Sequence, residues 1–240
     1  MAILVTGGAG YIGSHTVAEL LERGEEVVVI DNLVTGHREA LLGGKLYEGD
    51  LRDKALLAKL FSENQIDAVI HFAASSLVGE SMKDPVKYYD NNVYGTQCLL
   101  EAMQKAGVNK IVFSSTAATY GEPEKVPIEE TDRTEPANVY GETKLTMERM
   151  MAWFDKVLDI KYVALRYFNA AGAHASGKIG EDHRPESHLI PLVSPYRSEP
   201  RRPTCPYHST RIPNAQEAAR RDSSGMGQAV CSDSVMVRLS

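Results

Sequence analysis

Residues 6–13 read TGGAGYIG, with glycines at Gly7, Gly10 and Gly13. They follow an apolar run, AILVT at residues 2–6, and they precede a segment whose apolar residues recur at helical spacing. Glycines permit a tight turn and let an anion approach the backbone where no Cβ intrudes, and the first N–H groups of a helix attract negative charge. The stretch therefore predicts a strand, a loop and a helix that together bind the pyrophosphate of a dinucleotide.

An acidic residue follows at the distance that such a site requires. Asp31 stands 18 residues after the last glycine of the loop and ends a second apolar run. A carboxylate at this place accepts hydrogen bonds from ribose hydroxyls and repels a 2′-phosphate. The next residues, Asn32 and Leu33, bring no arginine, so the pattern favours NAD over NADP. Asp50 and Leu51, after a third strand, suit the edge of the adenine.

Apolar runs and helical segments alternate along the rest of the first 170 residues. The runs are apolar throughout, which is typical of strands buried on both faces of a parallel sheet. We therefore predict an α/β fold, a doubly wound parallel sheet of the Rossmann type. The further strands are expected at residues 67–72, 110–115 and 161–167, and the helices at residues 11–23, 53–61, 85–106 and 140–153.

A second motif provides acid–base chemistry. Tyr140 and Lys144 are four residues apart, so on a helix they lie on one face. A free tyrosine has a pKa near 10, and a pKa near 7 requires that the phenolate be stabilised by about 4 kcal/mol. A nearby ammonium and the positive nicotinamide ring would provide this stabilisation. Thr116, which follows a predicted strand, would hydrogen-bond the hydroxyl that is oxidised. The alternative for this spacing is an exposed helical turn with a packed tyrosine.

Composition excludes several other classes of function. The formal net charge of −6 disfavours a nucleic-acid partner. No apolar stretch reaches the roughly 18 residues of a membrane span, and no basic leader precedes the first strand. Three scattered cysteines suggest no disulfide framework, the histidines lack metal-ligand spacing, and His71 is expected to pack in the core. We predict a cytoplasmic protein that holds no metal.

Taken together, the motifs resemble the UDP-glucose 4-epimerases of the extended short-chain dehydrogenase family. The resemblance covers residues 1 to about 193. It rests on TGGAGYIGSH at 6–15, DNL at 31–33, FAASSLVGES at 72–81, YYDNNVYGT at 88–96, SSTAATYG at 114–121, YGETK at 140–144 and RYFNAAGA at 166–173.

The resemblance implies an isomerase of carbohydrate metabolism that interconverts UDP-glucose and UDP-galactose. Tyr140 would take the proton from the sugar 4-hydroxyl while C4 is oxidised, and a 4-keto sugar would then turn over in the site before its reduction. NAD would be regenerated in each cycle. The family also implies a homodimer formed by the helices at 85–106 and 140–153.

The resemblance also implies contacts for individual residues. Catalysis falls to Tyr140, Lys144 and Thr116, and substrate binding to Thr116, Tyr140 and, at the nucleotide diphosphate, Asn169. Residues beside the cofactor would be Gly7, Gly10, Tyr11, Ile12, Gly13, Asp31, Asn32, Leu33, Val34, Thr35, Gly36, Asp50, Leu51, Phe72, Ala73, Ala74, Ser75, Ser76, Asn92, Tyr140, Lys144 and Phe168.

Two alternatives stay open. A sugar-nucleotide dehydratase would carry an acidic pair, or a serine and a glutamate, after the threonine, and Ala117 and Ala118 stand there instead. An inactive NAD-binding fragment is the other alternative, because the family motifs stop near Val193. By this interpretation residues 1–168 form the NAD-binding domain and residues 169–193 are only a stub of the C-terminal substrate domain.

The remaining residues, 194–240, differ in composition from the rest. They contain seven arginines and no lysine, together with five of the eleven prolines. A segment with so little apolar periodicity cannot bury enough surface to offset its ordering entropy, so we predict a disordered tail. The change is typical of a wrong reading frame or a foreign end, and reading the gene in all three frames around Val193 tests this hypothesis.

Overall fold

A six-stranded, fully parallel sheet forms the centre of the molecule. The computed structural model describes residues 2–182, of which those up to Phe168 form one compact unit. The strand order is β3-β2-β1-β4-β5-β6, so the predicted doubly wound sheet is confirmed. The strands are β1 Ala2–Thr6, β2 Glu26–Asp31, β3 Lys45–Glu48, β4 Ile66–His71, β5 Lys110–Thr116 and β6 Lys161–Tyr167.

Strand β1 lies at the point where the strand order reverses. Val5 pairs with Val29 of β2 on one side and with Ile70 of β4 on the other. The loops after β1 and β4 therefore leave the sheet at the same edge and diverge toward opposite faces. In open α/β sheets, ligands bind in the crevice that opens at such a point.

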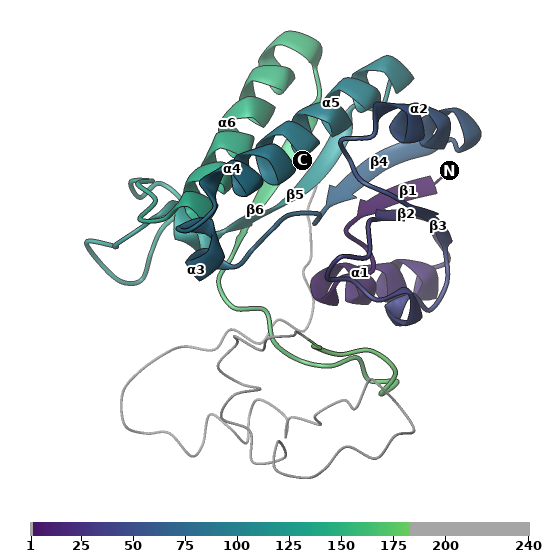
Figure 1. Cartoon of the computed structure of the whole chain (residues 1–240), viewed down its shortest axis with the longest axis horizontal. Helices are drawn as coiled ribbons and strands as arrows, with labels where there is room; N and C mark the ends of the chain where they lie inside the picture. The colour runs from purple at the N-terminus through teal and green to yellow at the C-terminus, as the bar shows by residue number, and fades with distance from the viewer. Residues whose placement is uncertain (1, 183–240) are drawn as a thin grey trace. The chain divides into compact units, whose positions relative to one another are not determined.

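Helices cover both faces of the sheet (Figure 1), with α1 on one face and α2, α5 and α6 on the other. Polar side chains begin α2 and α6. Asp53 accepts hydrogen bonds from the backbone N–H groups of Ala55 and Leu56, and Asn138 accepts one from Gly141. The helices are α1 Tyr11–Glu22, α2 Lys54–Glu63, α3 Val78–Ser81, α4 Pro85–Tyr88, α5 Gly95–Ala106 and α6 Val139–Leu158, with 3₁₀ turns at Arg38–Ala40 and Ala117–Thr119.

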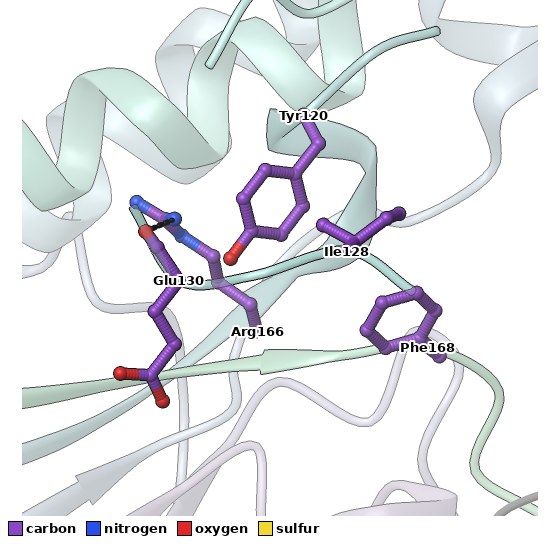
Figure 2. A pocket seen from close by; sticks show the side chains of 5 residues that line it. All are labelled: Tyr120, Ile128, Glu130, Arg166 and Phe168. Carbon is purple, nitrogen blue, oxygen red and sulfur yellow. Dashed lines mark hydrogen bonds between the residues drawn. The ribbon is translucent and has the colours of Figure 1, made fainter. Parts of the chain in front are cut away.

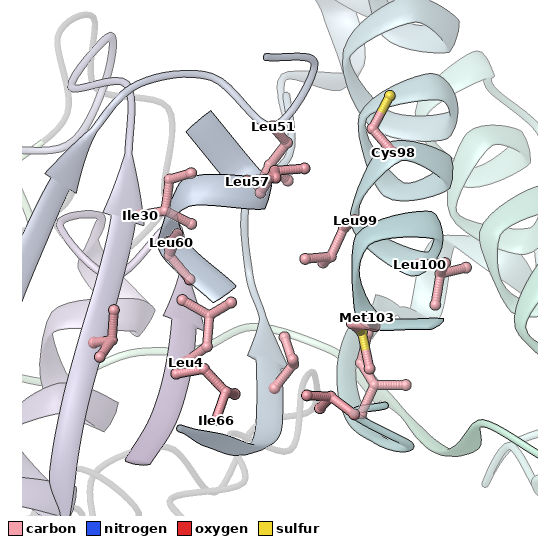
Figure 3. Close-up of a cluster of buried hydrophobic side chains, with 14 of the residues drawn as sticks. Leu4, Ile30, Leu51, Leu57, Leu60, Ile66, Cys98, Leu99, Leu100 and Met103 are labelled. Atoms are coloured by element: carbon pink, nitrogen blue, oxygen red, sulfur yellow. The ribbon is translucent and has the colours of Figure 1, made fainter. Parts of the chain in front are cut away.

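The larger core lies between the sheet and the helices α2, α5 and α6 (Figure 3). Leu4 of β1, Leu57 and Leu60 of α2, and Leu99 and Met103 of α5 are all inaccessible to solvent. Each such side chain stabilises the fold by about 2 kcal/mol through burial. On the other face, a smaller cluster packs valines of β1 and β2 against α1. Strands β1 and β2 therefore have both faces covered, as predicted, whereas every residue of β6 after Lys161 is only half-buried.

Several predicted boundaries need correction. The helix expected at residues 85–106 is not one regular helix, because a π-helical segment, Tyr89–Tyr94, separates α4 from α5. The strand expected at residues 67–72 is Ile66–His71. Helix α6 runs past the predicted end, to Leu158, and stops where Asp159 takes a left-handed conformation. The spacing of apolar residues shows where a helix lies. It does not reveal the wider turns of a π-helical segment within that helix.

Residues 169–182 lie beyond the sheet-containing unit and form a short turn. In it, the His174 backbone N–H donates to the carbonyl of Ile179 at 3.0 Å. The end of the predicted stub, residues 183–193, and the predicted tail, residues 194–240, lie outside the described residues. Within residues 2–182, no helix is both long and apolar enough to span a membrane.

Candidate functional site

The glycine-rich loop packs too closely for a side chain at Gly7 and Gly13. Gly7 has φ of +68°, and a Cβ there would lie 2.6 Å from the backbone nitrogen of Ala73. A Cβ at Gly13 would lie 2.1 Å from the carbonyl oxygen of Gly7. Gly10 caps α1, whose first turn holds Tyr11, Ile12 and Gly13. The first N–H groups of α1 thus follow directly on the glycine-rich loop, where the sequence predicts an anion-binding site.

Asp31 connects the loop after β2 to the glycine-rich loop. Its two carboxylate oxygens accept hydrogen bonds from the backbone N–H groups of Ala9, at 3.0 Å, and Leu33, at 2.8 Å. Burial raises the pKa of Asp31 above its usual value, and these two hydrogen bonds lower it by smaller amounts. Leu33 itself takes a left-handed φ of 56°, which the hydrogen bond to Asp31 helps to hold.

Beside it, Asp50 stands at the end of β3 in a network of charges. It is bonded to Arg52 at 2.6 Å and accepts a hydrogen bond from the Asn32 amide at 3.1 Å. These partners, Arg52 above all, lower the pKa of Asp50 to about 2. Arg52 also forms an ion pair with Asp90 in the π-helical segment. The arginine thus links the predicted adenine edge to the helix that carries Asn92.

Asn92 binds the loop that follows β4. Its amide oxygen accepts the Ser75 N–H at 2.8 Å, and its amide nitrogen donates to the Ser75 carbonyl at 3.0 Å. The same nitrogen donates to the hydroxyl of Thr143 on α6 at 3.1 Å. Asn92 is inaccessible to solvent, so it fixes the predicted cofactor loop, residues 72–76, to the helix of Tyr140 and Lys144.

Lys144 is a buried cation on the inner face of α6. Its Nζ donates to the Ser114 carbonyl at 2.8 Å and lies 4.9 Å from the centre of the Phe113 ring and 5.9 Å from that of Tyr140. Burial lowers the pKa of Lys144 to about 7, although the nearby carboxylate of Glu148 opposes the shift. A buried lysine with a shifted pKa beside a tyrosine marks a candidate for proton chemistry.

Tyr140 and Thr116 meet at the same place. Tyr140 lies in the first turn of α6, Thr116 ends β5, and their side chains are hydrogen-bonded. Burial raises the pKa of Tyr140, and the hydrogen bond with Thr116 lowers it by a smaller amount. The protein's own residues therefore shift this pKa in the direction opposite to the one that the sequence suggested, because the cost of burying a phenolate exceeds the favourable contact.

A partly buried ion pair, which the sequence did not predict, stands next to this trio. The carboxylate of Glu148 accepts hydrogen bonds from Arg166 of β6, the shorter at 2.7 Å, and from the hydroxyl of Ser115. Glu148 is one turn beyond Lys144 on the same buried helix face. Glu148 stands among apolar residues on the buried face of α6, and a charged residue in such a position is the feature of the sequence that could have predicted the ion pair.

A cavity of about 340 Å³ opens beside the end of β6 (Figure 2). Arg166 forms its polar side, with the guanidinium 4.7 Å from the centre of the Tyr120 ring and a 3.4 Å hydrogen bond to the Glu130 carbonyl. Ile128 and Phe168 form the apolar side. Of the predicted site residues only Phe168 lines this cavity.

The remaining predicted residues can be placed by the loops that hold them. All predicted residues except Asn169 lie at or just beyond the carboxyl end of a strand, or in the helix that follows it. Asn169 is the first residue after the sheet-containing unit. Asn32, Val34, Thr35 and Gly36 follow β2, Leu51 follows β3, and Phe72, Ala73, Ala74 and Ser76 follow β4. Among residues 2–182 no group of His, Cys, Asp and Glu is arranged to hold a metal ion.

Comparison with known proteins gives consistent matches. A family model described as the NAD dependent epimerase/dehydratase family matches residues 3–202. The UDP-glucose 4-epimerase of Halalkalibacterium halodurans is 63% identical over 193 residues, which are 80% of this chain and 58% of that protein. The family match extends slightly past Val193, where the family motifs were expected to stop.

Solved structures agree with this match. The UDP-glucose 4-epimerase from Brucella ovis in complex with NAD is 51% identical with a TM-score of 0.78, over 80% of this chain and 59% of that one. The enzyme from Bifidobacterium longum in complex with NAD⁺ and UDP is 45% identical with a TM-score of 0.74, over 77% and 58%. The chain thus spans a little under three fifths of the length of these relatives.

Proposed function

The chain belongs to the NAD dependent epimerase/dehydratase family, and on that premise we propose that it binds NAD and acts in the epimerisation of a UDP-hexose at C4. The observation that carries the proposal is the meeting of Thr116, Tyr140 and Lys144 beside a glycine-rich loop. The proposed reaction is also supported by the relatives, since a protein that is 63% identical to this chain is named UDP-glucose 4-epimerase. The proposal assigns residues 1–168 to cofactor binding and residues from 169 onward to the start of a substrate domain.

The residues present fit NAD. Gly7 and Gly13 let the loop pack against the Ala73 backbone and against its own carbonyl at distances that no Cβ would allow, which is the tight turn that a pyrophosphate-binding loop needs. Asp31 offers its carboxylate to ribose hydroxyls and repels a 2′-phosphate, which favours NAD over NADP. Asp50 and Leu51 would hold the adenine, and Asn92, Lys144 and Phe168 would also contact NAD. When bound, NAD supplies the reversible oxidation of a secondary alcohol to a ketone.

Each residue of the trio has a distinct task in this mechanism. Tyr140 takes the proton of the sugar 4-hydroxyl at its phenol oxygen and later returns it. Thr116 orients that hydroxyl by a hydrogen bond. Lys144 lies 5.9 Å from the centre of the Tyr140 ring, where its ammonium form would favour the phenolate. Catalysis of this kind contributes typically 10²- to 10⁴-fold.

Epimerisation is favoured over dehydration by the residues next to Thr116. A dehydratase must remove and donate protons at neighbouring carbon atoms, so it needs two further titratable groups. Here Ala117 and Ala118 follow Thr116, and the Ala118 N–H donates to the threonine hydroxyl at 3.2 Å. Neither alanine can transfer a proton. The position therefore supports Thr116 as an orienting residue in an epimerase.

Two further parts of the proposal are a homodimer and a cytoplasmic location. Both come from the family resemblance and the composition of the chain. Sedimentation of the purified chain tests the first, and fractionation of cells that express it tests the second.

The decisive experiment uses the purified chain. Bound nucleotide is released with acid and identified by mass spectrometry, and a second sample is incubated with UDP-galactose and assayed for UDP-glucose. We expect NAD rather than NADP, together with turnover. NAD without turnover would limit the chain to cofactor binding and overturn the proposed epimerisation, while a failure to bind NAD would overturn the site itself.

A further inference from the structure

His71 ends β4 and is fully buried. Its ring stacks on that of Phe113, with centroids 5.6 Å apart. Both ring nitrogens have partners, since Nδ1 lies 2.6 Å from the hydroxyl of Thr6 and Nε2 lies 2.8 Å from that of Thr96. The histidine therefore joins the strand that enters the glycine-rich loop to helix α5, across the centre of the sheet.

The direction of each hydrogen bond follows from its neighbours. The Thr96 hydroxyl has one proton, which it donates to the Asn92 carbonyl at 2.6 Å, so it must accept from Nε2 of His71. A neutral ring with its proton on Nε2 accepts at Nδ1, so Thr6 is the donor there. Thr6 in turn accepts the N–H of Ala73 at 3.4 Å. The donors thus run in one direction, from Ala73 to Asn92.

This chain of hydrogen bonds ends inside the proposed cofactor site. Asn92 lies in the π-helical segment, and such segments occur frequently at functional sites. The side chain of Asn92 holds Ser75 on one side and the hydroxyl of Thr143 on the other. Thr143 donates to the carbonyl of Tyr140 at 2.8 Å. His71 therefore acts, through Thr96 and Asn92, on both the loop after β4 and the helix of Tyr140.

We propose that His71 is a positioning residue of the cofactor site, which in one fixed tautomer holds the π-helical segment so that Asn92 keeps Ser75 and Thr143 in place. The inference rests on the proposed binding of NAD. It assigns a role to a residue that touches neither cofactor nor substrate. The role depends on direction, because only the ring with its proton on Nε2 satisfies both threonines.

The surroundings of His71 keep the ring neutral. Burial lowers the pKa of His71 to about 3, and the positive charge of Lys144 adds to the effect. No carboxylate is among the groups that shift this pKa. The ring is therefore neutral at pH 5 to 8, and the hydrogen bonds of Thr96 and Thr6 decide which of its nitrogens carries the proton.

The first test reads the tautomer without any cofactor. Long-range ¹H–¹⁵N spectra of the chain labelled with ¹⁵N-histidine are recorded from pH 5 to pH 8, and the signals absent from His71→Phe assign the residue. We expect a neutral ring with its proton on Nε2 at every pH. A proton on Nδ1, or titration near the ordinary histidine pKa of about 6.5, would overturn the proposal.

The second test measures the dissociation constant of NAD⁺ by calorimetry. We expect His71→Phe and Thr96→Val each to weaken binding about tenfold, the double variant to be no weaker than the worse single one, and His71→Gln to recover part of the affinity by donating to Thr96. Thr146→Val is the matched control, because this hydroxyl on α6 reaches only Glu142. If His71→Phe does not fold, Thr96→Val still tests the proposal, because it removes the hydroxyl that His71 contacts.

The outcomes separate the two proposals. Folded variants that bind NAD⁺ like the wild type would overturn the positioning role alone. A wild-type chain that binds no NAD⁺ would overturn the proposed function and the positioning role with it. Weakened binding in the His71 and Thr96 variants, with Thr146→Val unchanged, supports both.

Discussion

The Nζ atom of Lys144 donates to the main-chain carbonyl of Ser114 at 2.8 Å, so the side chain of a helix residue is fixed to the strand that ends at Thr116. The ammonium is thereby held on the same side of α6 as the ring of Tyr140, at 5.9 Å from its centre. Because the cation is only 2% exposed, the arrangement has a cost in stability that depends on pH.

That cost gives the first prediction. Unfolded Lys144 keeps its proton up to about pH 10.5, whereas in the folded chain burial lowers its pKa to about 7. Between these values the unfolded state binds more protons, so the free energy of unfolding rises with pH, by at most about 1.4 kcal/mol per unit. We expect Lys144→Met to remove this rise. Urea denaturation at pH 7 to 10 measures it, with Lys110→Met at an exposed position as control. An unchanged slope in Lys144→Met would contradict the lowered pKa.

Removal of the phenol separates chemistry from binding. Tyr140→Phe deletes the group that takes the sugar proton, so we expect turnover of UDP-galactose to fall by about 10²- to 10⁴-fold. The affinity for NAD⁺ should stay within about twofold, because the ring and its packing remain. Tyr89→Phe, at an exposed tyrosine, is the control and should retain full turnover. A Tyr140→Phe chain that turns over at the wild-type rate would exclude the tyrosine as the acid–base group.

The glycine-rich loop is the part of the site that sequence predicts best, because its requirement is local. Gly7 and Gly13 are excluded from carrying a side chain by backbone atoms a few residues away or in the adjoining loop. The central strands β1 and β2 are equally well predicted, since both of their faces are covered. The spacing of Tyr140 and Lys144 on one helix is local as well, and the structure brings Thr116 to them.

Other features depend on contacts between residues far apart in sequence. His71 was expected to be packed, and it is, but its partners Thr6 and Thr96 are 65 and 25 residues away. The pKa of Tyr140 was expected to fall under the charges of an ammonium and a nicotinamide ring, whereas the protein's own residues raise it, chiefly through burial. Sequence identifies the charges around a phenol, whereas the extent of burial, which raises this pKa, emerges only from the packed structure.

The glycine requirement gives a prediction with a matched control. Gly13→Ala would place its Cβ 2.1 Å from the Gly7 carbonyl oxygen, so either the loop or the start of α1 must move. We expect the affinity for NAD⁺ to fall at least tenfold, together with a loss of stability on the order of 1–3 kcal/mol. Gly79→Ala, at a helical position with open space around it, should be neutral or slightly stabilising. Equal effects at the two positions would show that close packing in the loop is not the cause.

The ion pair between Glu148 and Arg166 gives the last prediction. Glu148→Gln leaves the guanidinium without its charged partner in a site where the two side chains are 10% and 23% exposed, so we expect a loss of about 3 kcal/mol in the free energy of unfolding. Glu148 also opposes the lowering of the Lys144 pKa, so its removal should shift that pKa further down. The rise in stability that Lys144 causes should then begin at a lower pH than in the wild type.

A double-mutant cycle with Arg166→Gln tells the two effects of Glu148 apart. If the loss of stability comes from the unpaired guanidinium, the double variant should be more stable than Glu148→Gln alone, because no buried charge is left without a partner. The shift in the Lys144 titration, in contrast, should persist in the double variant, since it depends on the carboxylate and not on Arg166. Urea denaturation of the four chains from pH 6 to pH 10 measures both quantities. Recovery of the Lys144 titration on removal of Arg166 would mean that Glu148 acts on the lysine through the position of β6 and not through its charge.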